Sequence, residues 1–179
     1  MRLSVLTPLL ISPVFGQLLV RDGKTIVDAL STLSDRLTTM DSTLDKINDE
    51  SNIDAAKDFQ NQATELGKEI QTATDAAKES AALNDDESAS VAYAVVDLTD
   101  GIYSVLDKTA EKRAVFDKIT VDDKPATELV KTELQNLQNA TDAFGETLTV
   151  KFVEDIKNVA PLLVSAIDFH FYQALQSYA

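Results

Sequence analysis

The sequence predicts an all-α protein, an antiparallel bundle of about five long helices that enclose an elongated apolar core or tunnel. One observation is a repeat of apolar residues at alternating steps of four and three, which continues from Ile26 to Leu148. Because an α-helix has 3.6 residues per turn, such positions share one face of a helix. The other observation is that short polar turns separate the periodic stretches. Short turns between long helices make consecutive helices antiparallel neighbours.

The first two predicted helices differ in the size of their apolar residues. The first starts after Gly23 and ends near Asn48, with its apolar stripe at Ile26, Leu30, Leu33, Leu37, Met40, Leu44 and Ile47. The second runs from about Asp54 to Ala82, with its stripe at Ala56, Phe59, Ala63, Leu66, Ile70, Ala73 and Ala77. The alanines either let neighbouring backbones approach closely or leave room for something that is not protein.

The third helix is predicted to begin at the polar turn 84–88, with Asp85 or Asp86 as its N-cap. It ends around residues 118–123, and Pro125 falls in the first turn of the fourth helix, where a missing N–H is tolerated. Gly145 weakens the prediction that this fourth helix continues straight. The third stripe consists of Val91, Val95, Leu98, Ile102 and Val105. Val96, Tyr103 and Leu106 widen it, which predicts that this helix contacts more than one neighbouring helix. The fourth stripe consists of Val130, Leu134, Leu137, Thr141, Phe144 and Leu148.

The last segment, from Phe152 to Leu175, is apolar on most sides. A helix of this kind is central in the bundle, or it faces a lipid or a partner. Pro161 indicates either a kink or the start of a new helix, so the prediction is five helices with a possible sixth short piece.

Composition excludes several classes of function. The net charge of -14 disfavours binding to nucleic acid or anionic bilayers and favours a soluble monomer. The absence of cysteine excludes disulfides, thiolate metal sites and thiol nucleophiles. The acidic turns lack the ligand spacing of a calcium loop, and His170 has no nucleophile placed beside it by any motif, so a surface or packed histidine is the better interpretation. We therefore expect no enzyme, no metal, no cofactor and no catalytic residues.

Residues 1–16 are predicted to be a secretory signal peptide, with cleavage before Gln17. Arg2 precedes an apolar stretch, and Val14 and Gly16 suit a small-residue cleavage site. A frayed amphipathic first helix is the alternative. The stretch is too short to span a bilayer, and no anchor signal is recognised at the carboxyl end, so no transmembrane anchor is expected. Residues 17–179 then form a single secreted domain.

Several sequence features, taken in order, resemble the fungal hydrophobic surface binding protein A family, which includes cell wall galactomannoproteins. They are Arg21-Asp22, the turn 83–88, the segment 112–118, Ile167-Asp168, Ala174-Leu175 and Tyr178. The resemblance implies a secreted or cell wall associated five-helix domain that binds fatty acids in an apolar tunnel. Members alternatively adsorb to hydrophobic surfaces and recruit a lipolytic enzyme. Compared with the longer mannoproteins, this protein is expected to have one domain and neither a Ser/Thr-rich stalk nor an anchor tail.

A lipid-binding tunnel is expected between the third and fifth helices and the Ala-rich face of the second. The predicted wall residues each lie mid-stripe: Leu37, Leu66, Leu98, Ile102, Leu137, Phe144, Ile167 and Phe171. Without the resemblance, the same stripes are an ordinary core. Lys112 falls near a stripe, but no cation clearly lies on one, so the head group is expected at a mouth among hydroxyls and water. Thr141 is expected to bond back to its own helix. Asn139 begins an N-glycosylation sequon on the solvent side.

Overall fold

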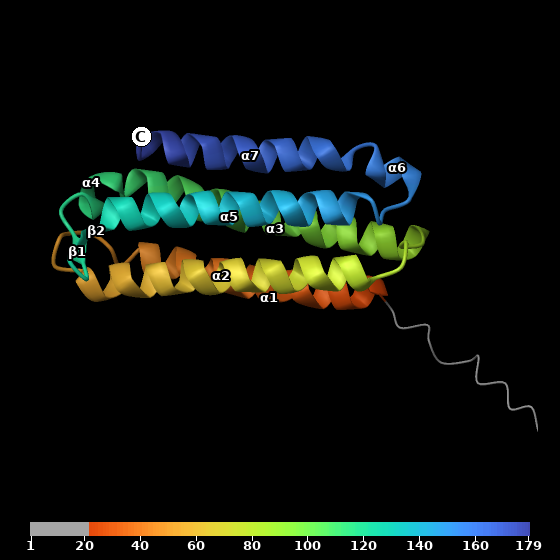
Figure 1. Ribbon diagram of the computed structural model, residues 1–179, viewed down its shortest axis with the longest axis horizontal. Coiled ribbons are helices and arrows are strands. Elements are labelled where there is room, and N and C mark those ends of the chain that lie inside the picture. The colour runs from red at the N-terminus through yellow and green to blue at the C-terminus, as the bar shows by residue number, and fades with distance from the viewer. Residues whose placement is uncertain (1–21) are drawn as a thin grey trace, which may run out of the picture.

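The computed structural model describes residues 22–179. The predicted signal peptide, residues 1–16, and the cleavage site before Gln17 lie outside the described residues. Five long helices run side by side along the longest axis of the molecule (Figure 1). They are α1 Asp22–Leu44, α2 Ile53–Glu79, α3 Asp85–Glu111, α5 Ala126–Thr149 and α7 Ala160–Ser177. The prediction of an all-α bundle with about five long helices is confirmed.

The five helices close into a ring in the order α1, α2, α5, α7, α3. In this order α1 packs against α2 and α3, whereas α7 bridges α3 and α5 on the side of the bundle away from α1 and α2 (Figure 1). The predicted stripes of α1 and α2 are buried throughout. The apolar faces of the helices therefore point into the ring, as expected for an amphipathic bundle.

Short elements close the two ends of the bundle. At one end, α4 Arg113–Phe116 leads into a hairpin of β1 Thr120–Val121 and β2 Lys124–Pro125. The hairpin turn places Asp122 and Asp123 at positive φ, 49° and 65°, which matches a two-residue type I′ turn. At the other end, α6 Glu154–Lys157 joins α5 to α7 (Figure 1).

The predictions for both ends of the third helix are wrong. Asn84, rather than Asp85 or Asp86, is the N-cap of α3. The Glu87 backbone N–H donates a hydrogen bond to Asn84 Oδ1, and the Asn84 backbone N–H donates one to the Glu87 carboxylate. The third helix also ends at Glu111, earlier than predicted. The chain then turns across the end of the bundle, where Phe116 and Ile119 become buried.

Gly145 and Pro161 mark the contact between α5 and α7. The helix α5 continues through Gly145 to Thr149, and an added Cβ at Gly145 would lie 2.9 Å from Val164 Cγ2. Glycine here allows α7 to approach closely. Pro161 occupies the first turn of α7, so it starts a new helix after the short α6, the second of the two predicted alternatives. Pro125 lies one position before the predicted place, as the N-cap of α5.

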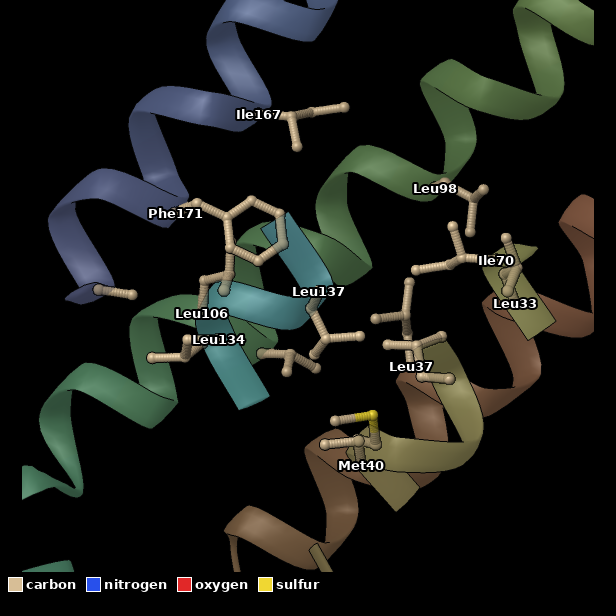
Figure 2. Close-up of a cluster of buried hydrophobic side chains, with 14 of the residues drawn as sticks. Leu33, Leu37, Met40, Ile70, Leu98, Leu106, Leu134, Leu137, Ile167 and Phe171 are labelled. Atoms are coloured by element: carbon tan, nitrogen blue, oxygen red, sulfur yellow. The ribbon is translucent and has the colours of Figure 1, made fainter. Parts of the chain in front are cut away.

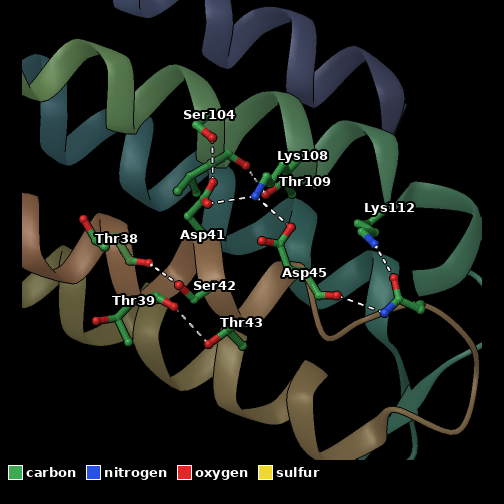
Figure 3. Close-up of polar contacts among 12 residues, drawn as sticks. Thr38, Thr39, Asp41, Ser42, Thr43, Asp45, Ser104, Lys108, Thr109 and Lys112 are labelled. Atoms are coloured by element: carbon green, nitrogen blue, oxygen red, sulfur yellow. Dashed lines mark hydrogen bonds and ion pairs between the residues drawn. The ribbon is translucent and has the colours of Figure 1, made fainter.

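A polar network joins α1 to α3 on the outside of the bundle (Figure 3). Lys108 Nζ lies 2.8 Å from Asp41 Oδ2 and 2.7 Å from Asp45 Oδ1, and Ser104 Oγ donates to Asp41 Oδ1 at 2.6 Å. The hydrogen bonds from Lys108 and Ser104 lower the pKa of Asp41. These contacts fix the two helices at the level of Asp41.

Candidate functional site

The ring of helices surrounds an extended apolar cavity with a volume of about 500 Å³. This value lies in the range of roughly 300–1,000 Å³ that is typical of small-molecule sites. Its wall includes α3 from Ala92 to Thr109, which corresponds to about 26 Å at 1.5 Å per residue. The cavity is therefore long enough to hold an extended chain.

All eight predicted wall residues line this cavity. They come from five helices: Leu37 from α1, Leu66 from α2, Leu98 and Ile102 from α3, Leu137 and Phe144 from α5, and Ile167 and Phe171 from α7. Figure 2 shows Ile167 and Phe171 extending from α7 toward Leu137, on the other side of the interior from Leu37 and Leu98. That these side chains contact a lipid stays a prediction.

The alanines on the stripe of α2 do not line the cavity, although larger residues of the same stripe do. Ala56, Ala63, Ala73 and Ala77 are buried, whereas α2 contributes Phe59, Leu66 and Ile70 to the wall. The predicted face of α2 thus borders the cavity through its larger residues, and a ligand against this face stays a prediction. Of the two roles considered for these small residues, the structure supports close packing of helices, because larger side chains would separate α2 from its neighbours.

The mouth of the cavity lies between α3 and the segment that joins α6 to α7. Val96, Val159 and Leu162 line the cavity although they are 51%, 55% and 73% exposed. Sequence reasoning did not locate this mouth, because Val96 was assigned to the widened third stripe, whereas Val159 and Leu162 belong to no predicted stripe. Other missed wall residues, including Leu33 and Phe59, lie on the predicted stripes, so the stripe pattern itself contained the signal for them.

The cavity wall carries no charged side chain among the described residues. Its polar groups are the hydroxyls of Thr109, Thr141 and Thr149. Thr109 Oγ1 donates to the Val105 carbonyl at 2.6 Å, and Thr149 Oγ1 donates to the Gly145 carbonyl at 2.7 Å. Thr141 makes no such bond to its own helix, contrary to the prediction, and its hydroxyl has no partner within residues 22–179. A buried carboxylate would thus find no counter-charge along the wall.

Lys112 is also absent from the cavity wall. Its Nζ donates to Asn48 Oδ1 at 2.9 Å, at the end of the bundle (Figure 3). The interior therefore suits an acyl chain far better than a charged head group.

Polar contacts hold both flanks of α7 against the bundle. Toward α5, Gln138 Nε2 donates to Asp168 Oδ1 at 3.0 Å. Toward α3, the His170 ring stacks on Tyr103 with centroids 3.8 Å apart, and its Nδ1 lies 3.4 Å from Asp107 Oδ1. His170 is thus a packed histidine, as predicted, and it does not line the cavity.

Three other features bear on function. Asn139 is exposed on α5, so the sequon is accessible, and glycosylation stays a prediction. Among residues 22–179, no group of three or more His, Asp or Glu side chains is placed to hold a metal ion. By length and composition alone α3 is apolar enough to cross a membrane, but in this bundle it packs against α1 and α7.

Fold and cavity together define a helical domain built around an internal, ligand-sized apolar space. The chain belongs to the hydrophobic surface binding protein A family, whose model matches residues 23–149. A comparison with curated protein sequences gives no significant match.

Solved structures share this fold over most of the chain. The crystal structure of Afmp4p in complex with palmitic acid aligns with a TM-score of 0.79 and 26% identity, covering 88% of this chain and 99% of that one. Ligand binding domain 1 of the Penicillium marneffei MP1 protein, complexed with arachidonic acids, aligns with a TM-score of 0.78 and 14% identity, covering 89% and 99%. Domain 2 of the same protein, complexed with multiple arachidonic acids, aligns with a TM-score of 0.73 and 12% identity, covering 89% and 96%.

Proposed function

We propose that the protein is a secreted, non-enzymatic binding protein that holds a long-chain fatty acid or a similar lipid in the cavity. The observation that carries this proposal is an elongated cavity with an apolar, uncharged wall and an apolar mouth. The palmitic acid bound by the similar protein Afmp4p supports a fatty acid as the ligand.

The energetics of burial agree with an acyl ligand. Burying one methylene contributes about 0.8 kcal/mol, so roughly ten to fourteen methylenes contribute about 8 to 11 kcal/mol before the cost of association. Micromolar or somewhat tighter affinity, on the order of -8 kcal/mol, remains after that cost. Because no cation lines the wall, the carboxylate stays at the mouth in contact with water.

Secretion is supported by the leader pattern at residues 1–16, and the exposed Asn139 is available for glycosylation once the chain is exported. Intact-mass measurement of protein recovered from the medium tests both points. Cleavage before Gln17 and a glycan on Asn139 are expected. Extracellular protein that retains Met1 would contradict the cleavage.

An alternative function is adsorption to hydrophobic surfaces with recruitment of a lipolytic enzyme, in which the bundle opens and exposes its stripes. The family to which the chain belongs favours this alternative. The proposed carrier keeps its helices closed around one ligand, whereas the adsorbing form loses its cavity.

Titration of the delipidated protein with palmitate separates the two functions. Saturable binding near one-to-one, with unchanged circular dichroism, is expected of the carrier. Uptake onto a hydrophobic surface without stoichiometry, and no saturable binding in solution, would contradict it. Mass spectrometry of an organic extract from the purified protein then identifies the lipid that the protein carries.

A further inference from the structure

The helix α7 is apolar on two opposite sides. Ile167 and Phe171 are buried and point into the bundle. Leu162, Phe169 and Tyr172 point outward, and the two aromatic residues are each 57% exposed. Folding of the bundle uses the inward side, so the outward side is left without a partner among the described residues.

The outward apolar residues form a continuous row that starts at the cavity mouth. We call this row the outer stripe: Val159, Leu162, Ala166, Phe169 and Tyr172, all of them exposed. Their steps of three and four place them on one side of the helix. Val159, Leu162 and Ala166 also line the cavity, whereas Phe169 and Tyr172 do not. The stripe therefore leads along the surface from the mouth.

The exposed face of α7 carries far less charge than the rest of the protein. The chain carries 30 acidic residues and 16 lysines and arginines, but α7 contains one acidic residue, Asp168, and neither lysine nor arginine. Asp168 contacts Gln138 of α5, and His170 contacts Tyr103 and Asp107 of α3. The exposed residues of α7 are all uncharged, so this face can lose its water without burying a charge.

We propose that the outer stripe docks on an uncharged lipid surface, such as a zwitterionic phospholipid layer, and that the ligand enters and leaves through the mouth while the protein is docked. This inference rests on the proposed carrier function. The net charge of -14 repels an anionic surface, and the stripe offers no cation to offset that repulsion. Phe169 and Tyr172 are of the type that settles at the boundary between head groups and acyl chains.

If the protein docks on a lipid surface, the fatty acid should be transferred during collisions between the protein and the acceptor membrane. A fatty acid that leaves through water moves at a rate set by its dissociation from the protein, which is independent of the amount of acceptor. A fatty acid that leaves at the docked surface moves at a rate that rises in proportion to the acceptor concentration.

The test measures transfer of a fluorescent fatty acid from the full chain to phosphatidylcholine vesicles that contain a quencher lipid. The transfer rate of the unmodified protein is expected to rise linearly with vesicle concentration. Admixture of phosphatidylglycerol should slow transfer, and added salt should reverse that effect. The double variant Phe169→Ser, Tyr172→Ser should transfer about tenfold more slowly, because two apolar anchors are lost.

The matched control is Ile53→Ser. Ile53 is an exposed apolar residue at the opposite end of the bundle from the mouth, so its replacement should leave the transfer rate unchanged. Since Phe169 and Tyr172 do not line the cavity, the double variant should also keep its equilibrium affinity for palmitate.

Flotation of the lipid-free protein with the same vesicles tests docking without any ligand. Equal flotation and equal transfer rates for the double variant and the unmodified protein would overturn the docking surface while leaving the carrier function intact. Absence of saturable palmitate binding by a protein that still floats would instead overturn the carrier function. Concentration-dependent dimerisation in sedimentation experiments that the double variant abolishes would assign the stripe to a second copy of the chain and overturn the proposal.

Discussion

Asp142 of α5 and Asp168 of α7 lie against each other beside the cavity wall. Burial, followed by the charge of Asp168, raises the pKa of Asp142 to about 6 from the ordinary 3.8. Asp168 already accepts a hydrogen bond from Gln138. Below the raised pKa Asp142 is protonated and uncharged, and above it two negative charges face each other. The contact between α5 and α7 is thus weaker at neutral pH than at acidic pH.

The first prediction follows from the sign of this shift. Since the pKa of Asp142 is higher in the folded state, its contribution to stability is fully present below about pH 4 and is lost as the pH rises through about 6. Asp142→Asn should therefore match the unmodified protein at about pH 4 and be the more stable of the two at about pH 7.5. Urea unfolding at both pH values measures the difference. A variant with the same relative stability at both would exclude the proposed repulsion.

The second prediction concerns the close approach of α7 to Gly145. In Gly145→Ala the new Cβ would meet Val164 Cγ2 at 2.9 Å, and the β-branched Val164 has little freedom to turn away. The clash should outweigh the gain in helix propensity and destabilise the protein by about 1 kcal/mol. Thermal unfolding measures this loss, and the added substitution Val164→Ala should restore most of it.

Gly67→Ala in α2 is the control for this experiment. A Cβ at Gly67 would lie 3.9 Å from Leu137 Cδ2, an ordinary contact. Without a clash, the substitution should stabilise the protein by roughly 0.5–1 kcal/mol through helix propensity. If both glycine variants gained stability, the proposed steric role of Gly145 would be wrong.

The buried stripes were accessible to sequence reasoning because helical periodicity records which face is inside. Leu98 and Phe144 were assigned to the wall in this way, and the structure places both there. Periodicity does not distinguish a wall residue from a packed one. Leu66 lines the cavity, whereas Ala73, two turns further along the same stripe, does not.

Features that depend on contacts between distant segments could not be predicted. The pairing of Asp142 with Asp168, and the exposure of Leu162 at the mouth, arise only when α7 is placed between α3 and α5. The hairpin after α4 was missed for a different reason. Its strands have two residues each, too short for an alternating pattern, and its turn uses Asp122 and Asp123 instead of glycine.

The third prediction uses the difference between Leu66 and Ala73. Leu66→Trp should extend the new ring into the cavity, block palmitate binding and leave the bundle folded. Ala73→Trp should instead destabilise the protein by several kcal/mol, because Ala73 is fully buried away from the cavity and its neighbours must move. Palmitate titration and thermal unfolding of both variants measure these effects. Unchanged palmitate binding by a folded Leu66→Trp protein would place the ligand elsewhere.

The last prediction locates the carboxylate of the ligand. Thr141 lies in the middle of the wall contributed by α5, and its hydroxyl has no hydrogen-bond partner within residues 22–179. If methylenes of the acyl chain pass this point, Thr141→Val replaces a hydroxyl with a methyl group at an apolar contact. Affinity for palmitate should then rise a few-fold, with little change in stability because no hydrogen bond is lost.

If the carboxylate of the ligand instead lies inside the cavity, Thr141→Val should lower the affinity for palmitate. A carboxylate seated at Thr141 would accept a hydrogen bond from its hydroxyl. Thr141→Val would then weaken binding by roughly ten- to a hundredfold, since a hydrogen bond to a charged group contributes about 1.5–3 kcal/mol. Calorimetric titration with palmitate and with its methyl ester distinguishes the two orientations. A head group at the mouth requires that Thr141→Val improve the affinity for both ligands. Weaker binding of palmitate alone would move the carboxylate inside, where it has no cation along the described wall.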